Sequence, residues 1–279
     1  FEIEPRTWAA VQAAAEQIRK VSAERVRDEL SKILLHSNRV AGFDLLVESG
    51  LMKVILPEIL DLKGCEQPPQ FHPEGDVFVH TRLMLSHLPE TVSLPLVLSV
   101  LLHDIAKPAT QTVDETGRIR FNGHDSLGAE MTETILRRLK FPNDVIEPTV
   151  VAVWNHMAFI NVKKMRTSTL KRFMSRPSFE DEMTLHRVDC MGSNGLLDNY
   201  AYVRGKAEEY SHEPIIPERL LTGKDLMELG WPSGRAMGRL LTALQNLQLE
   251  GELRSREDAL AWVAENAPKP GVFDGETGG

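Results

Sequence analysis

One segment of the chain reads Leu94-Pro95-Leu96-Val97-Leu98-Ser99-Val100-Leu101-Leu102-His103-Asp104, an almost continuous apolar run that ends in a histidine and an aspartate. Such a run predicts a segment inside the hydrophobic core, so the two ionisable side chains are expected at the edge of that core. Burying them there without a partner would cost on the order of several kcal/mol. A bound metal ion is the simplest partner, and we therefore interpret His103 and Asp104 as metal ligands.

Four other side chains of the types that bind metals lie before and after this pair: His80, His124, His156 and Asp189. Taken singly each is a weak indicator, because most histidines are solvated or hydrogen-bonded, and the chain has nine of them. Taken together, their nitrogens and oxygens suit one or two divalent ions such as Mn, Ni, Mg, Fe or Zn. Since a divalent ion can ionise water near neutral pH, the six residues indicate a site for hydrolysis of phosphate esters.

These residues resemble a known signature. The order His80, then His103-Asp104, then Asp189 is similar to the motif of HD-domain phosphohydrolases, in which those side chains hold one metal ion. The resemblance implies that His124 and His156 are the additional ligands of members with two ions. The sequence segments around these residues resemble the HD domain in the C-terminal half of bacterial tRNA nucleotidyltransferases and poly(A) polymerases. The segments are Phe71-His72-Pro73-Glu74-Gly75-Asp76-Val77 before His80-Thr81, Leu102-His103-Asp104-Ile105-Ala106-Lys107-Pro108, and Gly123-His124-Asp125.

The resemblance to this family covers nearly all of the 279 residues. The segments 1–8 and 21–30 are similar to its helical neck, and 221–226 and 249–253 to its C-terminal tail. The chain has no Gly-Ser phosphate loop and no Asp-x-Asp pair, which the nucleotide-adding head would need, and it begins in mid-motif at Phe1. We therefore expect a fragment of a longer protein that does not itself add nucleotides.

Two residues are expected to act directly in catalysis. Asp104 is the best candidate to bridge two ions, because a carboxylate has two oxygens and an imidazole offers one free nitrogen. With only one ion bound, His124 and His156 would contact phosphate instead. Lys107 follows Asp104 by three positions and either neutralises a phosphate oxygen in the same cleft or is a helix C-terminal cation before Pro108.

Other residues near the motif are weaker candidates. His186 and His87 lie on the helices expected to carry Asp189 and His80, and each is a substitute ligand or only a neighbour. His72 and Glu74 belong to the segment before His80 that resembles the family, and they are expected to line the pocket without binding the metal.

The net charge of −8 argues against a protein that binds nucleic acid over its whole surface. A local basic stretch with Lys163, Lys164 and Arg166 lies between two predicted ligands and either binds substrate phosphate or RNA or forms a solvated helix face. The expected partner is a nucleotide or an RNA 3′ end, tRNA included, with no DNA and no membrane. The sequence leaves the oligomeric state open.

Helical signals dominate, and the predicted fold class is all-α, an HD-domain helical bundle with one small hairpin. Ser22 is expected to cap a helix over 23–35, and three Ser/Thr–Asp pairs are capping-box patterns: Ser178 with Asp181, Thr222 with Asp225, and Ser255 with Asp258. A helix is expected to start near Pro148 and to carry His156 toward its far end. The hairpin is predicted from 110–113 and 118–121.

Proline-rich and polar breaks at 64–73 and 213–217 divide the chain into four predicted segments. These are a helical, RNA-binding-like neck at 1–63, the metal-dependent phosphohydrolase domain at 64–212, a helical tail at 213–267 and a disordered end at 268–279. At 42% hydrophobic and 26% charged residues, with no long apolar run and no signal peptide, the chain is expected in the cytoplasm. Cys65 and Cys190 are expected to be free thiols there.

The leading hypothesis is a divalent-metal-dependent phosphohydrolase that acts on phosphomonoesters or 2′,3′-cyclic phosphates of nucleotides or RNA ends. The reaction class follows from the ligand set, and the RNA-end substrate from the family resemblance. One alternative is a non-catalytic RNA-binding body of a tRNA-processing enzyme, whose metal site serves only structure. Another is a nucleoside triphosphate or guanosine tetraphosphate hydrolase.

Overall fold

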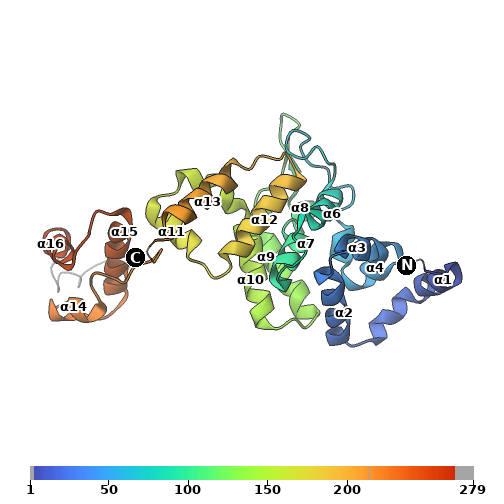
Figure 1. Ribbon diagram of the computed structural model, residues 1–279, viewed down its shortest axis with the longest axis horizontal. Helices are drawn as coiled ribbons and strands as arrows, with labels where there is room; N and C mark the ends of the chain where they lie inside the picture. Colours follow the sequence, from blue (N-terminus) through green and yellow to red (C-terminus); the bar gives the residue numbers. More distant parts are fainter. Residues whose placement is uncertain (1–2, 213, 268–279) are drawn as a thin grey trace. The chain divides into compact units, whose positions relative to one another are not determined.

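The computed structural model describes residues 3–212 and 214–267, which form helices and a single two-stranded hairpin (Figure 1). The all-α prediction is confirmed. The N-terminal elements are α1 Pro5–Ala14, the 3-10 helix η1 Ala15–Lys20, α2 Ala23–Leu35, α3 Arg39–Glu48, α4 Leu51–Ile55 and α5 Pro57–Leu60. The middle elements are α6 Val77–His87, α7 Leu94–Leu102, α8 Lys107–Thr110, β1 Thr112–Val113, β2 Ile119–Arg120, α9 His124–Arg138, α10 Asn143–Asn155, the 3-10 helix η2 His156–Lys164, α11 Thr167–Met174, α12 Phe179–Gly192 and α13 Asp198–Glu209. The last are α14 Gly223–Glu228, α15 Arg235–Glu250 and α16 Arg256–Asn266.

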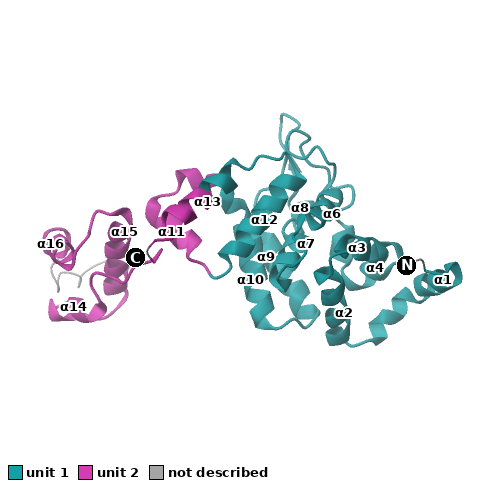
Figure 2. Cartoon of the chain, viewed as in Figure 1, with its two compact units in different colours: residues 1–160, 177–202 teal, residues 161–176, 203–279 magenta. Residues whose placement is uncertain are grey.

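The chain forms two compact units (Figure 2). Unit 1 contains residues 1–160 and 177–202, and unit 2 contains residues 161–176 and 203–279. These unit boundaries differ from the boundaries of the four segments expected from the sequence. The four segments stay a prediction. The segment 268–279, predicted to be disordered, lies outside the described residues. Within those described residues, no helix combines the length and the apolarity that crossing a membrane requires.

The apolar run before His103 forms α7, the central helix of unit 1. All of its residues from Leu96 to Leu102 are buried, and the helix packs against α6, α10, α12 and α2. Ser93 caps it, since its Oγ accepts a hydrogen bond from the backbone nitrogen of Leu96 at 3.1 Å, and Pro95 lies in its first turn. Burial on all sides explains the almost purely apolar sequence of this helix.

Most of the predicted helix starts agree with the structure. α2 spans the predicted residues, and the capping boxes at Thr222 and Ser255 are both formed. The helix start predicted at Ser178 is confirmed, but the capping box of Ser178 with Asp181 is not formed. Ser178 precedes α12 but donates its hydroxyl to Glu182 at 2.8 Å, while the Asp181 carboxylate accepts a hydrogen bond of 2.5 Å from Ser93. A partner from the start of α7 thus replaces the local cap.

The helix expected to start near Pro148 starts earlier. α10 begins at Asn143 and continues through Pro148 to Asn155, with His156 directly after it. Because proline lacks an N–H, one backbone hydrogen bond is lost, but the helix is held by packing against α9 and α7. The expected position of His156 at the far end of this helix is confirmed.

The hairpin is confirmed in a shorter form. Its antiparallel strands pair Thr112 with Arg120 and Val113 with Ile119. Asp114 closes the turn, because its Oδ1 accepts hydrogen bonds from the backbone nitrogens of Thr116 and Arg118, at 3.0 and 3.1 Å. The hairpin is therefore an ordered loop between the segments that carry Asp104 and His124.

Unit 2 has a core of its own, built from the connection before α14 and from α14, α15 and α16. Its largest buried side chain is Trp231, which lies in the break between α14 and α15. α11 packs on α15, where the Arg172 guanidinium donates to Asn246 at 3.0 Å. Residues 230–234 lie in the break between α14 and α15. In the described part of the chain the two cysteines, Cys65 and Cys190, are free thiols, as expected.

Candidate metal centre

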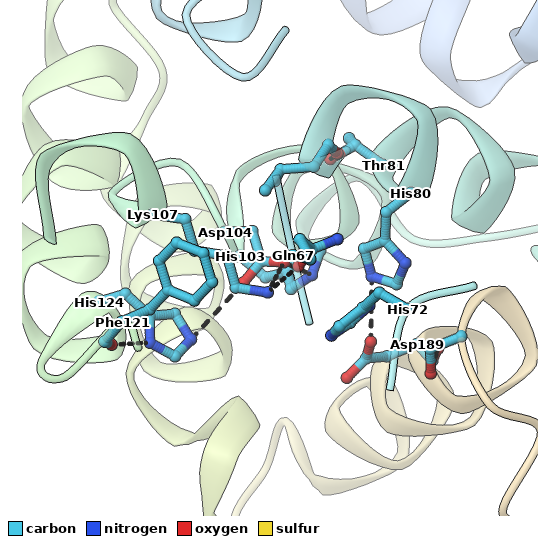
Figure 3. A network of polar contacts seen from close by, with 12 residues as sticks. Gln67, His72, His80, Thr81, His103, Asp104, Lys107, Phe121, His124 and Asp189 are labelled. Atoms are coloured by element: carbon cyan, nitrogen blue, oxygen red, sulfur yellow. Dashed lines mark hydrogen bonds and ion pairs between the residues drawn. The ribbon is translucent and has the colours of Figure 1, made fainter. Parts of the chain in front are cut away.

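The six residues predicted as ligands all lie in unit 1, on five different helices or their ends. Figure 3 shows His80, His103, Asp104, His124 and Asp189. His80 lies on α6, the pair His103 and Asp104 directly follows α7, and His124 is the first residue of α9. His156 lies at the junction of α10 and η2, and Asp189 lies in the last turn of α12. Asp189 is partly open, with 27% of its side chain exposed, and the other five are buried. The fold thus brings together residues that are more than a hundred positions apart.

Asp104 is the shared member of two clusters of donor atoms. One cluster combines it with His80 and His103, and the other with His124 and His156. Its two oxygens are divided between them: Oδ2 lies 3.1 Å from His103 Nε2, whereas Oδ1 lies 3.6 Å from His124 Nε2 and 3.9 Å from His156 Nε2. The carboxylate therefore faces two groups of imidazoles at once.

Three of the histidines are oriented by the same local contact. The Nδ1 atom lies within hydrogen-bond distance of the backbone carbonyl three residues earlier, at 3.0 Å for His103, 2.6 Å for His124 and 2.5 Å for His156. An Nδ1–H that donates to a carbonyl fixes the tautomer in which Nε2 carries the lone pair. The helix ends therefore present the Nε2 atoms toward Asp104.

The donor set fits a cation. Among the described residues, the buried His80 Nε2, His103 Nε2 and Asp104 Oδ2 atoms have no hydrogen bond of good geometry, although charged neighbours lie between 2.7 and 3.1 Å away. The Nε2 atoms of His124 and His156 face each other at 3.1 Å. Two nitrogen ligands of one zinc-like ion, each about 2.1 Å from it, lie about 3–3.4 Å apart. These positions therefore suit divalent ions.

The charges in the site also favour a cation. Burial raises the pKa of Asp104, but His103 and Lys107 outweigh it, and the pKa lies well below the ordinary value. Asp189 follows the same pattern, since its contact with His80 overcomes the effect of burial and lowers its pKa. Burial, followed by the charge of His103, lowers the pKa of His156 to about 4. Two carboxylates and a neutral imidazole therefore face the site at pH 7.

Asp189 lies at the edge of the donor set. Its Oδ1 is 3.1 Å from His80 Nε2, but it joins none of the three-residue donor clusters found in the described chain. Burial opposes the charge of His80, yet the carboxylates of Asp189 and Glu74 raise its pKa to about 10. The position that attracts a proton in this way is also one that attracts a metal ion.

Lys107 points into the site. It is the first residue of α8, with Pro108 in the first turn, so it does not terminate a helix as the alternative interpretation required. Its Nζ lies 2.7 Å from Asp104 Oδ2 and donates to Gln67 Oε1 at 2.6 Å. With 8% of its side chain exposed, this cation is held against the central carboxylate.

Glu74 and Gln67 were not expected in contact with the motif residues. Glu74 Oε1 lies 2.7 Å from His80 Nδ1 and 2.9 Å from His72 Nδ1, and these three residues form a third donor cluster. The resemblance of the segment before His80 to the family indicated His72 and Glu74 as pocket residues, but nothing in the sequence indicated Gln67. Its role depends on a contact across 40 positions.

The two histidines weighed as substitute ligands lie apart from the donor clusters. The ring of His186 stacks on Phe159, with centroids 4.4 Å apart, and burial lowers its pKa. His87 ends α6 and joins no cluster of possible ligands in the described chain. The predicted substrate-binding residues Lys163, Lys164 and Arg166 are exposed and belong to unit 2, so their role stays a prediction.

A cavity of about 590 Å³ opens next to the donor set. The charged and imidazole side chains that line it include Asp104, Lys107, His124, His156 and Asp189. Further walls come from the loop before α6, from the hairpin and from the turn after α12. The site is therefore open to a substrate, unlike a structural metal site that is closed by its ligands.

Comparison with known proteins gives two family matches. The HD domain matches residues 77–189, and a segment described as a probable RNA and SrmB-binding site of polymerase A matches residues 1–62. The first match includes all six predicted ligands. The second covers α1 to α5, which have no residue in the donor clusters.

Curated relatives match most of the chain. A CC-adding tRNA nucleotidyltransferase of Thermus thermophilus is 34% identical over 248 residues, which is 86% of this chain and 56% of the relative. An A-adding tRNA nucleotidyltransferase of Deinococcus radiodurans is 32% identical over 291 residues, 96% of this chain and 66% of the relative. A multifunctional CCA protein of Herminiimonas arsenicoxydans is 27% identical over 83% of this chain and 58% of its own length. The chain thus spans 56% to 66% of the length of these relatives.

Proposed function

Because the chain belongs to the HD-domain family of tRNA nucleotidyltransferases and poly(A) polymerases, we propose that it is a divalent-metal-dependent phosphohydrolase. Its substrates would be phosphomonoesters or 2′,3′-cyclic phosphodiesters of nucleotides or RNA ends. The observation that carries the proposal is the position of Asp104, whose two oxygens face different groups of histidines beside an open cavity.

Two ion positions are proposed. His80, His103, Asp104 and Asp189 would hold one ion, and Asp104, His124 and His156 would hold the other. Divalent ions there would supply Lewis-acid chemistry, lowering the pKa of water and neutralising charge on a phosphoryl group. The ligand types are compatible with Mn, Ni, Mg, Fe or Zn.

The protein's own groups would prepare the site for this chemistry. The backbone carbonyls of Val100, Phe121 and Val153 contact the Nδ1 atoms of three imidazoles, which would leave each Nε2 free to bind an ion. Lys107 brings a positive charge to the cavity wall, where it would neutralise a phosphate oxygen. The partly open Asp189 leaves the site accessible from the cavity.

RNA is the proposed partner. The polymerase A RNA-binding match over residues 1–62 and the tRNA-directed names of the relatives support it. The exposed Lys163, Lys164 and Arg166 would add to phosphate binding. The same match favours a second candidate function, an RNA-holding body in which the metal has only a structural role.

One experiment separates these two functions. Purified protein is analysed for bound metals, stripped with a chelator and reloaded with Mn, Ni or Mg. It is then assayed on nucleoside monophosphates, 2′,3′-cyclic nucleotides, a nucleoside triphosphate and guanosine tetraphosphate. The proposal predicts phosphate-ester hydrolysis that is lost on stripping and regained on reloading. Tight, salt-dependent tRNA binding by the stripped protein, with no hydrolysis under any metal, would establish the RNA-holding body instead.

A further inference from the structure

The cavity beside the metal centre is larger than a phosphoryl group requires. Its volume of about 590 Å³ is within the roughly 300–1,000 Å³ typical of sites that enclose whole small molecules. Much of its wall is apolar and lies outside the donor set: Phe71, Phe121, Met157, Ile160 and Leu196. A substrate that fills it must therefore carry an apolar group besides the phosphate.

Phe71 and Arg118 lie together in this wall. The Arg118 guanidinium lies 5.8 Å from the centre of the Phe71 ring, and 44% of Phe71 is exposed. No carboxylate pairs with the Arg118 side chain within residues 3–212 and 214–267, whereas neighbouring Arg120 is bound by Asp114 at 2.8 Å. An exposed ring beside an unneutralised guanidinium is suited to a planar, electron-rich ligand.

This surface is held in place before any ligand binds. The backbone nitrogen of Phe71 donates to the carbonyl of Pro68 at 3.0 Å, and that of Arg118 donates to Asp114 Oδ1 at 3.1 Å. Gly117, with φ of 79°, allows the tight turn that precedes Arg118. Backbone hydrogen bonds thus restrain both loops that carry the pair, which lowers the entropy cost of binding.

Polar groups for hydrogen bonding lie in the same cavity. Asn122 follows the hairpin, and Ser193, Asn194 and Asn199 come from the turn after α12 and the start of α13. Asn194 already accepts a hydrogen bond from the backbone nitrogen of Leu196 at 3.0 Å. Amide side chains that donate and accept are the groups that recognise the edge of a nucleobase.

We propose that Phe71 and Arg118 form a nucleobase-stacking surface, so that the metal centre acts on nucleotides rather than on phosphate esters in general. This inference rests on the proposed function for its catalytic consequence, but the stacking itself does not require activity. A phosphate near Asp104 and a base on Phe71 would occupy one cavity together. The nucleotide can be free or can terminate an RNA, because the stacking chemistry is the same.

The test compares a nucleotide with a matched substrate that lacks the base. kcat/KM is measured for adenosine 5′-monophosphate and for ribose 5-phosphate in Phe71→Ala, Arg118→Ala and Phe71→Trp. In each alanine variant, kcat/KM for adenosine 5′-monophosphate divided by kcat/KM for ribose 5-phosphate should fall at least about fivefold. This factor corresponds to the lower end of the binding free energy that one stacked base contributes. Phe71→Trp should keep the ratio. Val113→Ala, an exposed hairpin residue outside the cavity wall, is the control. A ratio that Phe71→Ala does not change would overturn the proposal.

A binding measurement tests the surface independently of catalysis. 2-Aminopurine riboside, whose fluorescence is quenched by stacking, is titrated into the full chain after metal removal. Quenching that Phe71→Ala abolishes and Phe71→Trp retains supports the surface even if no phosphate ester is hydrolysed, in which case the proposed function alone fails. Absence of quenching in the unaltered protein overturns the stacking surface even if the protein is an active phosphatase. If Phe71→Ala weakens the binding of adenosine monophosphate and of a phosphate-terminated oligonucleotide equally, RNA ends are among the ligands. If it weakens the binding of only one of them, the surface serves that ligand alone.

Discussion

The imidazoles of His124 and His156 face each other through their Nε2 atoms at 3.1 Å. The Nδ1 atom of each is in contact with a backbone carbonyl, so both Nε2 atoms present lone pairs to the space beside Asp104. Two lone pairs at this distance repel each other unless a cation lies with them. Burial lowers the pKa of His156 to about 4, so its Nε2 lone pair is unprotonated at pH 7 and available to a metal ion.

Asp104→Ala should abolish metal uptake and reduce phosphatase activity by more than about 100-fold, the upper end of what the loss of a supporting residue costs a metal site. The reason is that this carboxylate belongs to both clusters. Elemental analysis and the phosphatase assay measure the two effects. Asp61→Ala, at an exposed carboxylate that is not among the cavity walls or the donor clusters, should behave like the unaltered protein. Full activity of Asp104→Ala would falsify the assignment.

His80→Ala and His156→Ala should each remove one ion and leave the other. They lie in different clusters that have only Asp104 in common. Metal stoichiometry of each variant after dialysis checks this expectation. If either substitution removes both ions, or neither, the two-position arrangement is wrong.

Glu74→Ala should lower metal affinity by about 10- to 100-fold without changing the number of ions bound. Glu74 contacts His80 at Nδ1, on the side of the ring away from Nε2, and so would orient this ligand. Competition with a metal indicator gives the affinity, and Glu74→Gln should recover part of it by preserving a hydrogen bond. A loss of one whole ion would instead identify Glu74 as a ligand.

Lys107→Ala should raise KM by roughly tenfold or more, which corresponds to losing one charge-assisted hydrogen bond to phosphate. Metal uptake should persist, because the substitution removes a competing cation 2.7 Å from Asp104. Steady-state kinetics give KM and kcat separately. Lys63→Ala is the control, since this lysine lies over the Phe78 ring outside the cavity wall. An unchanged KM in Lys107→Ala would remove the residue from substrate binding.

The metal-free protein should lose stability as the pH falls from about 6.5 toward 4. Burial, then the charge of His103, lowers the pKa of His156 to about 4, whereas the unfolded chain binds this proton near pH 6.5. Over this pH range the unfolded state therefore binds more protons than the folded state. This difference lowers the free energy of unfolding by about 2 kcal/mol at about pH 5. Denaturant unfolding at pH 7 and pH 5 measures the difference. His156→Gln should reduce it, whereas the exposed His36→Gln should not. The same pH dependence in all three proteins would contradict the expectation.

The sequence predicted the parts of this structure that depend on local chemistry. The apolar run before His103 indicated a buried helix, and α7 is buried from Leu96 to Leu102. The capping boxes at Thr222 and Ser255 also formed, because each needs only neighbours within four positions.

The features that sequence reasoning missed depend on distant partners. Asp181 contacts Ser93, 88 positions away, instead of capping its own helix. Gln67 binds Lys107 across 40 positions, and no local pattern marks such a glutamine. Pro148 lies inside α10 because packing against two other helices offsets the lost hydrogen bond. Residue type and order led to five residues that the fold gathers into donor clusters around Asp104, but their supporting contacts required the fold.

The carbonyls that hold His103, His124 and His156 belong to the backbone, three positions before each ring, and not to other side chains. No single side-chain replacement can delete these supports, which makes the imidazole orientation robust to mutation. The same arrangement makes it sensitive to fraying of the terminal turns, since unwinding one turn frees the ring to rotate. On heating, release of bound ions would therefore report local opening of helix ends before the core of unit 1 melts.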